Sequence, residues 1–183
     1  MDKLKSPQSA NSSLGQAFQG LCQKLETFAD LRDPLYICIA GGMAVHLHTG
    51  LRATRNVDAQ FYKKIHVPND LSVSYKDGAD QQSILRFNMG YNPNHSLLPT
   101  GYAERSIKVD VGTKYIQPHI LCINDLIISK ISRFSKVDQE DIELLSMYVD
   151  CDLEAIGAGV EVALSQTVGS TKHVRQNADC VLE

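Results

Sequence analysis

Two glycines and a short polar motif are the residues best placed to do chemistry in this sequence. Gly41 and Gly42 end the apolar run 35–40, and Asn56 and Asp58 follow a short distance along the chain. Glycines at the end of a strand let backbone N–H groups approach a phosphate, and the start of a helix there favours negative charge. Acidic side chains beside such a turn can hold divalent ions for phosphoryl or nucleotidyl transfer. The pattern therefore predicts a phosphate site next to a metal site.

The elements that must position these residues form an α+β pattern. In a strand that starts near Val57, alternation puts Asn56 and Asp58 on one face and Val57 on the other. The helix predicted before the sheet covers 13–33. The expected strands are 35–39, 57–62, 71–75, 84–87 and 106–111, and the expected later helices are 124–134, 138–148 and 152–166. This order predicts a small mixed β-sheet core with a helical C-terminal lobe.

The same pattern predicts four segments along the chain. We expect a disordered N-terminus over 1–12, an α/β core over 13–118, a helical lobe over 119–166 and a flexible tail over 167–183. The segment 88–102 is rich in Asn, Pro, Gly and Ser and predicts a long loop, which is typical of functional or disordered segments.

Composition limits the class of protein. The 183 residues carry a net charge of −3, which gives no overall basic surface for nucleic acid. Five cysteines without a C-x-x-C pair are typical of reduced thiols and not of a zinc site. The polar start lacks the apolar stretch of a signal peptide, and no apolar run is long enough to span a bilayer. We expect a cytoplasmic protein without a membrane partner.

Two stretches carry a resemblance to a known family. The glycine pair followed by Arg52, Thr54 and Asp58 resembles the signature of the nucleotidyltransferase superfamily, which has the DNA polymerase beta-like fold. The chain is most similar to small bacterial nucleotidyltransferases of toxin–antitoxin and abortive-infection systems. The stretch 125–142 also resembles that group, so the resemblance covers about 35–148.

The resemblance implies roles for particular residues. Gly41 and Gly42, with Arg52 and Thr54, would hold the triphosphate of an NTP. Mg²⁺ or Mn²⁺ would be held by Asp58, by Asn56 at the family's first aspartate position, and by Asp110 as the third carboxylate.

Lys130 has two interpretations. It would touch a nucleotide phosphate if it acts in the site, or it would join Arg133, Asp138 and Asp141 in salt bridges between two helices.

Asn56 departs from the family pattern because an asparagine offers a metal one neutral oxygen and no charge. Losing one such charge would cost about 3–4 kcal/mol of transition-state stabilisation. Three explanations stay open: a weakened enzyme, a fold kept for binding, or an engineered substitution. A pairing of Asp58 with Gln60 fits the Arg-x-Thr spacing less well.

Three functions follow from these residues. The first is a metal-dependent enzyme that transfers a nucleotidyl group from an NTP to RNA, such as tRNA, or to a protein side chain. The second is an inactive nucleotidyltransferase fold that binds a cognate toxin or antitoxin protein. The third is a nucleotide sensor that binds NTP without turnover. Asn56 favours the two binding functions over the enzyme but does not decide among the three.

Overall fold

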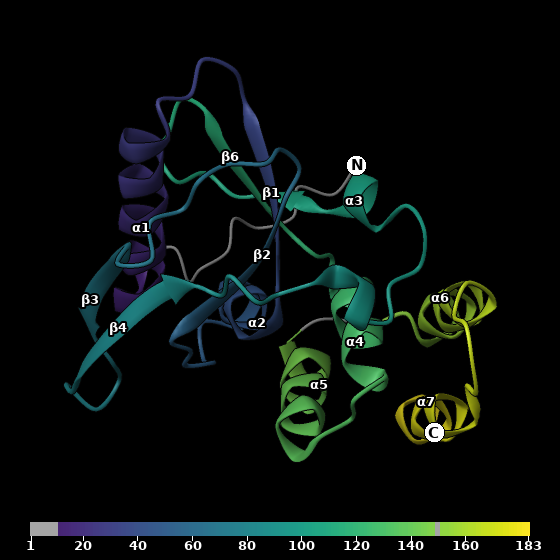
Figure 1. The fold of residues 1–183 in the computed structure, drawn as a ribbon. Helices are drawn as coiled ribbons and strands as arrows, with labels where there is room; N and C mark the ends of the chain where they lie inside the picture. Colours follow the sequence, from purple (N-terminus) through teal and green to yellow (C-terminus); the bar gives the residue numbers. More distant parts are fainter. Residues whose placement is uncertain (1–10, 149–150) are drawn as a thin grey trace. The chain divides into compact units, whose positions relative to one another are not determined.

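The computed structural model describes residues 11–148 and 151–183 (Figure 1). The described residues divide into two compact units. The first takes the chain up to Tyr91 together with Ile107–Ile120, and the second takes Asn92–Ser106 with the chain from Leu121 onward. The predicted core over 13–118 therefore differs from the first unit, because the loop 92–106 belongs with the helices of the second.

The first unit is built on a mixed sheet of six strands in the order β3-β4-β2-β1-β6-β5. Their bounds are β1 Leu35–Ala40, β2 Asn56–Phe61, β3 Ser72–Lys76, β4 Gln82–Phe87, β5 Ile107–Lys108 and β6 Ile116–Ile120. Strand β2 runs antiparallel to β1 and parallel to β4, and β1 runs parallel to β6. The edge strands β3 and β5 are antiparallel to their neighbours. The expected α+β fold with a small mixed sheet is confirmed.

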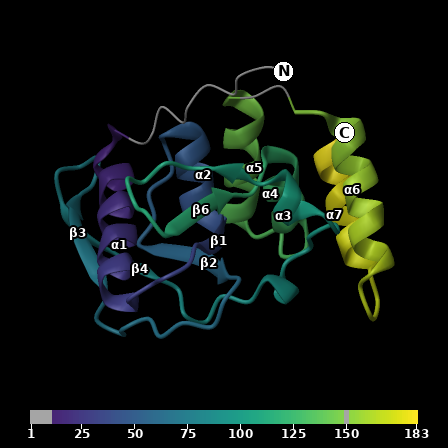
Figure 2. The same ribbon diagram turned by 90° about the horizontal axis from the view of Figure 1, so that it is seen from above.

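Two helices pack on this sheet. Helix α1 (Ser13–Ala29) contacts β3, β4 and β6, and α2 (Gly41–Thr49) contacts β1 and β2. The N-cap of α1 is Ser12, and its hydroxyl also bonds His46 of α2 at 2.7 Å. The bond holds the start of α1 beside α2 (Figure 2). Gly50 closes α2 with a φ of 75°, a left-handed conformation that glycine adopts easily.

Alternating burial separates the two faces of the sheet. Val57 and Ala59 are buried in the core, as are Leu85 and Phe87 of β4. The residues between them, including Asn56 and Asp58, therefore point to the opposite face. This alternation agrees with the pattern predicted for β2.

The second unit is helical. It contains a short 3₁₀ turn and five α-helices, of which α4 contacts α5, α6 and α7. Their bounds are η2 Pro93–His95, α3 Tyr102–Arg105, α4 Ile123–Ile131, α5 Lys136–Tyr148, α6 Leu153–Ser165 and α7 Lys172–Leu182.

Two of the expected segments differ from the structure. The segment 167–183, expected to be a flexible tail, contains α7, whose buried residues are Val174 and Ala178. The strand expected over 106–111 is shorter: β5 covers Ile107 and Lys108, and the Val109 N–H also donates to the Pro118 carbonyl at 2.9 Å. The disorder expected over 1–12 falls almost wholly outside the described residues. Within the described ranges, no helix has the length and hydrophobicity needed to cross a membrane.

Glu26 on α1 ties the helix to the start of β6. Its carboxylate accepts backbone N–H bonds from Lys114, Tyr115 and Ile116, the first and last at 3.2 and 3.0 Å. Burial raises the pKa of Glu26, but these three bonds outweigh it and leave the pKa below its usual value. The ionised carboxylate therefore stabilises the folded first unit.

Stability should fall in acid as Glu26 becomes protonated. A carboxyl with a depressed folded pKa stabilises the protein above its unfolded pKa of about 4.3, and this contribution is lost as pH falls through the folded value. Glu26→Gln should cost about 1–2 kcal/mol at pH 7 and reduce the acid dependence. Urea unfolding from neutral to acidic pH measures both, with the exposed Glu143→Gln as control. Equal pH profiles for wild type and Glu26→Gln would contradict this role.

Candidate functional site

The end of β1 lies directly against Asp58. Ala40 pairs with Asp58 in the register of β1 and β2, and α2 begins at the next residue. Gly41 has a φ of +59°, which favours glycine, and a Cβ there would overlap the Asp58 carboxylate. No side chain caps the start of α2, so its first N–H groups have no side-chain acceptor there. The structure thus brings the glycine turn and Asp58 together.

Thr54 and Arg52 shape the loop beneath this turn. A Cβ on Gly42 would lie 3.2 Å from the Cβ of Thr54, and Arg52 also approaches it. The Thr54 hydroxyl donates to the Asn56 carbonyl at 3.0 Å, and Tyr75 donates to the Thr54 carbonyl at 2.8 Å. Thr54 therefore supports the close approach of the loop to Gly42.

His46 of α2 also contacts the loop between α2 and β2. Its Nδ1 lies 2.8 Å from the Arg52 carbonyl, which can only accept, so this nitrogen carries a proton. Burial lowers the pKa of His46. In the neutral ring Nε2 then accepts from the Ser12 hydroxyl. His46 is thus a structural link between α1, α2 and the loop that precedes β2.

Strand β4 adds two residues that sequence reasoning missed. The parallel register sets Asn56 beside Arg86 and Val57 beside Phe87, so Asn88 comes level with Asp58. The Asn88 amide nitrogen donates to Asp58 Oδ1 at 2.7 Å. Its own oxygen accepts from the Gly90 N–H at 3.1 Å, which fixes the orientation of the amide. Asn88 thus occupies the place next to Asp58 that the sequence analysis assigned to Asp110.

Asp110 lies elsewhere on the sheet. It follows β5, which is three strands away from β2, across β1 and β6. Three strand spacings amount to roughly 14 Å. Continuing the β5–β6 register places Asp110 near Gln117, which pairs with Tyr36 of β1. Tyr36 is four residues from Ala40, the partner of Asp58, so Asp110 is also displaced from Asp58 by about 13 Å along the strands. The structure does not bring Asp110 into metal-bridging distance of Asp58. This correction arises because strand order cannot be counted from chain order.

The residues around Asp58 do not match the donor set of a two-metal site. The positions beside it are the amides of Asn56 and Asn88, and Asn88 directs its N–H₂ group at the carboxylate. Across residues 11–148 and 151–183, no cluster of three or more His, Cys, Asp or Glu side chains could hold a metal. A pair of divalent ions needs several anionic oxygens, whereas Asp58 offers one carboxylate with one oxygen already bonded.

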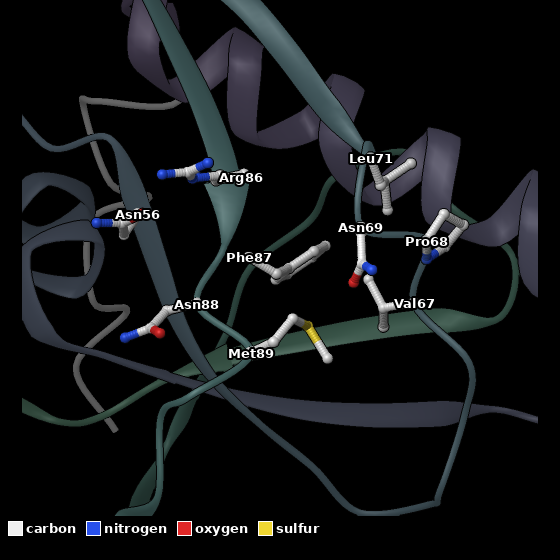
Figure 3. A pocket seen from close by; sticks show the side chains of 9 residues that line it. All are labelled: Asn56, Val67, Pro68, Asn69, Leu71, Arg86, Phe87, Asn88 and Met89. Carbon is white, nitrogen blue, oxygen red and sulfur yellow. The ribbon is translucent and has the colours of Figure 1, made fainter.

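A pocket of about 390 Å³ adjoins these residues at the end of β4. Asn56, Arg86 and Asn88 help to line it, together with Phe87 and Met89 and with the loop residues Val67, Pro68, Asn69 and Leu71. Figure 3 shows the polar side chains of Asn56, Arg86 and Asn88 on one side, and Phe87 and Met89 turned toward the loop. The pocket therefore has a polar side next to Asp58 and an apolar side.

Lys130 lies in the second unit and is 5% exposed. Its Nζ is 2.6 Å from Asp141 Oδ2 and 3.8 Å from Asp138 Oδ1. Arg133 also pairs with Asp138. Burial raises the pKa of Asp138, but the bonds from Arg133 and Ser135 outweigh it and hold this pKa at about 2. The salt-bridge set between α4 and α5 is therefore formed. The phosphate contact of Lys130 stays a prediction.

The fold and the glycine–Asp58 site agree with a family comparison. Residues 16–178 match the model of the family "Nucleotidyltransferase of unknown function (DUF6036)". The chain belongs to this family and is nucleotidyltransferase-like. A comparison with curated proteins found no match. The family description mentions no toxin–antitoxin role, metal or substrate, and these stay predictions.

Replacing Gly41 should damage the site locally. Gly41→Ala places a Cβ at a positive φ and against the Asp58 carboxylate, which should cost about 2 kcal/mol or more of unfolding free energy. The control is Gly78→Ala, because a Cβ there meets nothing within 4 Å. Urea unfolding compares the two. Equal stability of both variants would show that the close approach of Gly41 to Asp58 is wrong.

Removing the buried ammonium tests the structural role of Lys130. Lys130→Met leaves Asp141 buried without its partner and should cost about 3–5 kcal/mol, whereas the exposed Lys136→Met should change stability by less than about 0.5 kcal/mol. Denaturant unfolding measures this difference. A stable Lys130→Met protein would argue against the ion pair as the main role of Lys130.

Proposed function

We propose that this nucleotidyltransferase-like protein binds a nucleoside triphosphate as a sensor or binding subunit, and does not catalyse metal-dependent nucleotidyl transfer at an ordinary enzymatic rate. The observation that carries this proposal is the hydrogen bond from the Asn88 amide to Asp58. A carboxylate at position 88 would repel Asp58 until a cation separated them, whereas the amide satisfies Asp58 without one.

Binding is supported by the parts of the site that remain. The uncapped start of α2 at Gly41 and Gly42 offers backbone N–H groups and a favourable helix dipole for a phosphate. Thr54 and Tyr75 hold the adjoining loop in place. These features support phosphate binding at the turn, whereas the two positions nearest Asp58 on this face carry amides and not the carboxylates that catalytic ions would need.

The proposal predicts how transfer activity should respond to restored carboxylates. Each missing charge should lower the rate by about a hundredfold or more. The wild type should therefore transfer little or no label from α-³²P NTPs to total RNA or to protein with Mg²⁺ or Mn²⁺. The Asn56→Asp/Asn88→Asp double variant should gain transfer, and Asn56→Asp alone should gain less.

The control for this assay is the same double variant with Asp58→Asn, which should lose the gained activity. Wild-type transfer at an ordinary enzymatic rate that Asp58→Asn abolishes would overturn the proposal. Failure of the double variant to gain activity would show that the loss of carboxylates at positions 56 and 88 is not what limits the site.

A further inference from the structure

We propose that the site binds the phosphate groups of a nucleotide directly, without a divalent cation, through the Arg86 guanidinium beside Asn56. This inference rests on the proposed function, because it assumes that a nucleotide is the ligand. It goes further by naming the group that recognises the phosphate, which is an arginine on β4, a strand outside the glycine–Asp58 motif.

The strand register sets Arg86 next to the altered positions. Arg86 is the partner of Asn56 across the β2–β4 pair, and its backbone N–H donates to the Arg55 carbonyl at 3.2 Å. Asn88 lies two residues further along β4 and therefore on the same face. Figure 3 shows the Arg86 guanidinium extended to the side of the strand on which Asn56 lies.

Arg86 is available for a ligand. Within the described part of the chain, its exposed guanidinium makes no hydrogen bond or ion pair, and neither does the side-chain amide of Asn56. Carboxylates at positions 56 and 88 would each lie within reach of Arg86 and would pair with it. With amides at both positions, the Arg86 guanidinium has no carboxylate partner there and can pair with phosphate oxygens instead.

The position of Arg86 also suits a phosphate held at the glycine turn. Strands β4 and β1 are separated only by β2, so their backbones are about 10 Å apart. The long Arg86 side chain can cover most of this span, and a phosphate at the start of α2 fills the rest. The guanidinium then takes the charge-neutralising role that divalent ions have in nucleotidyl transfer.

Calorimetric titration of the full chain with ATP tests this inference, in MgCl₂ and again in EDTA without added metal. Affinity should be nearly equal in the two buffers. Arg86→Gln should weaken binding by about tenfold to a hundredfold. The exposed Arg32→Gln, in the loop before β1, is the matched control and should bind like wild type. Inorganic triphosphate titrated in parallel shows whether the nucleoside adds affinity to the phosphate contact.

The outcomes separate this inference from the proposed function. ATP binding that requires Mg²⁺, or that Arg86→Gln leaves unchanged, overturns direct recognition by Arg86 while a nucleotide-binding function stands. Absence of binding by ATP, GTP, CTP and UTP in both buffers overturns the proposed function and this inference with it. In the Asn56→Asp/Asn88→Asp variant, binding should instead become dependent on Mg²⁺.

Discussion

The parallel pairing of β2 with β4 is the constraint on which the chemistry of this site depends. It sets Asp58 beside Asn88 and Asn56 beside Arg86, so both residues of the polar motif have a neighbour from the β4 side. The antiparallel pairing with β1 brings Gly41 against the other side of Asp58. Asp58 is therefore held between a glycine turn and an amide. The glycine turn and the Asn88 amide therefore determine which ligands fit beside Asp58.

This arrangement separates two properties that a nucleotidyltransferase normally combines. Phosphate binding uses backbone N–H groups and cations, whereas catalysis also needs anionic oxygens to hold metal ions. We propose that the start of α2 supplies the first set, whereas Asp58 is the carboxylate present beside it for the second. Arg86 can neutralise phosphate charge without a metal, but a fixed guanidinium cannot activate an attacking hydroxyl as metal ions can. This difference is the reason for proposing a binding function and not a catalytic one.

Much of the local structure could be predicted from the sequence, because it depends on neighbours in the chain. The alternation of Asn56, Val57 and Asp58, the glycine break after β1 and the cap at Gly50 each depend on a few adjacent residues. The residue opposite Asp58 could not be predicted in this way. Asp110 was chosen because it lies in an alternating segment, but strand order places that segment three strands away.

Asn88 was missed because it carries no charge and directly follows a predicted strand, at the start of a segment that reads as a loop. The signal that could have found it is its place at the end of the strand 84–87, at the point where a side chain reaches the neighbouring strand. The helix α7 was missed for another reason. Most residues of 172–182 are polar and its buried positions are Val174 and Ala178, so its apolar content is low although its apolar residues lie at helical spacing.

The central claim is that Asp58, with amides on either side, does not form a metal site. Titration with Mn²⁺ followed by electron paramagnetic resonance tests it most directly, since free and bound Mn²⁺ give different signals. At sub-millimolar Mn²⁺, wild type and Asp58→Asn should bind equally little, whereas Asn56→Asp/Asn88→Asp should bind tightly. Tight binding by the wild type that Asp58→Asn removes would contradict the claim.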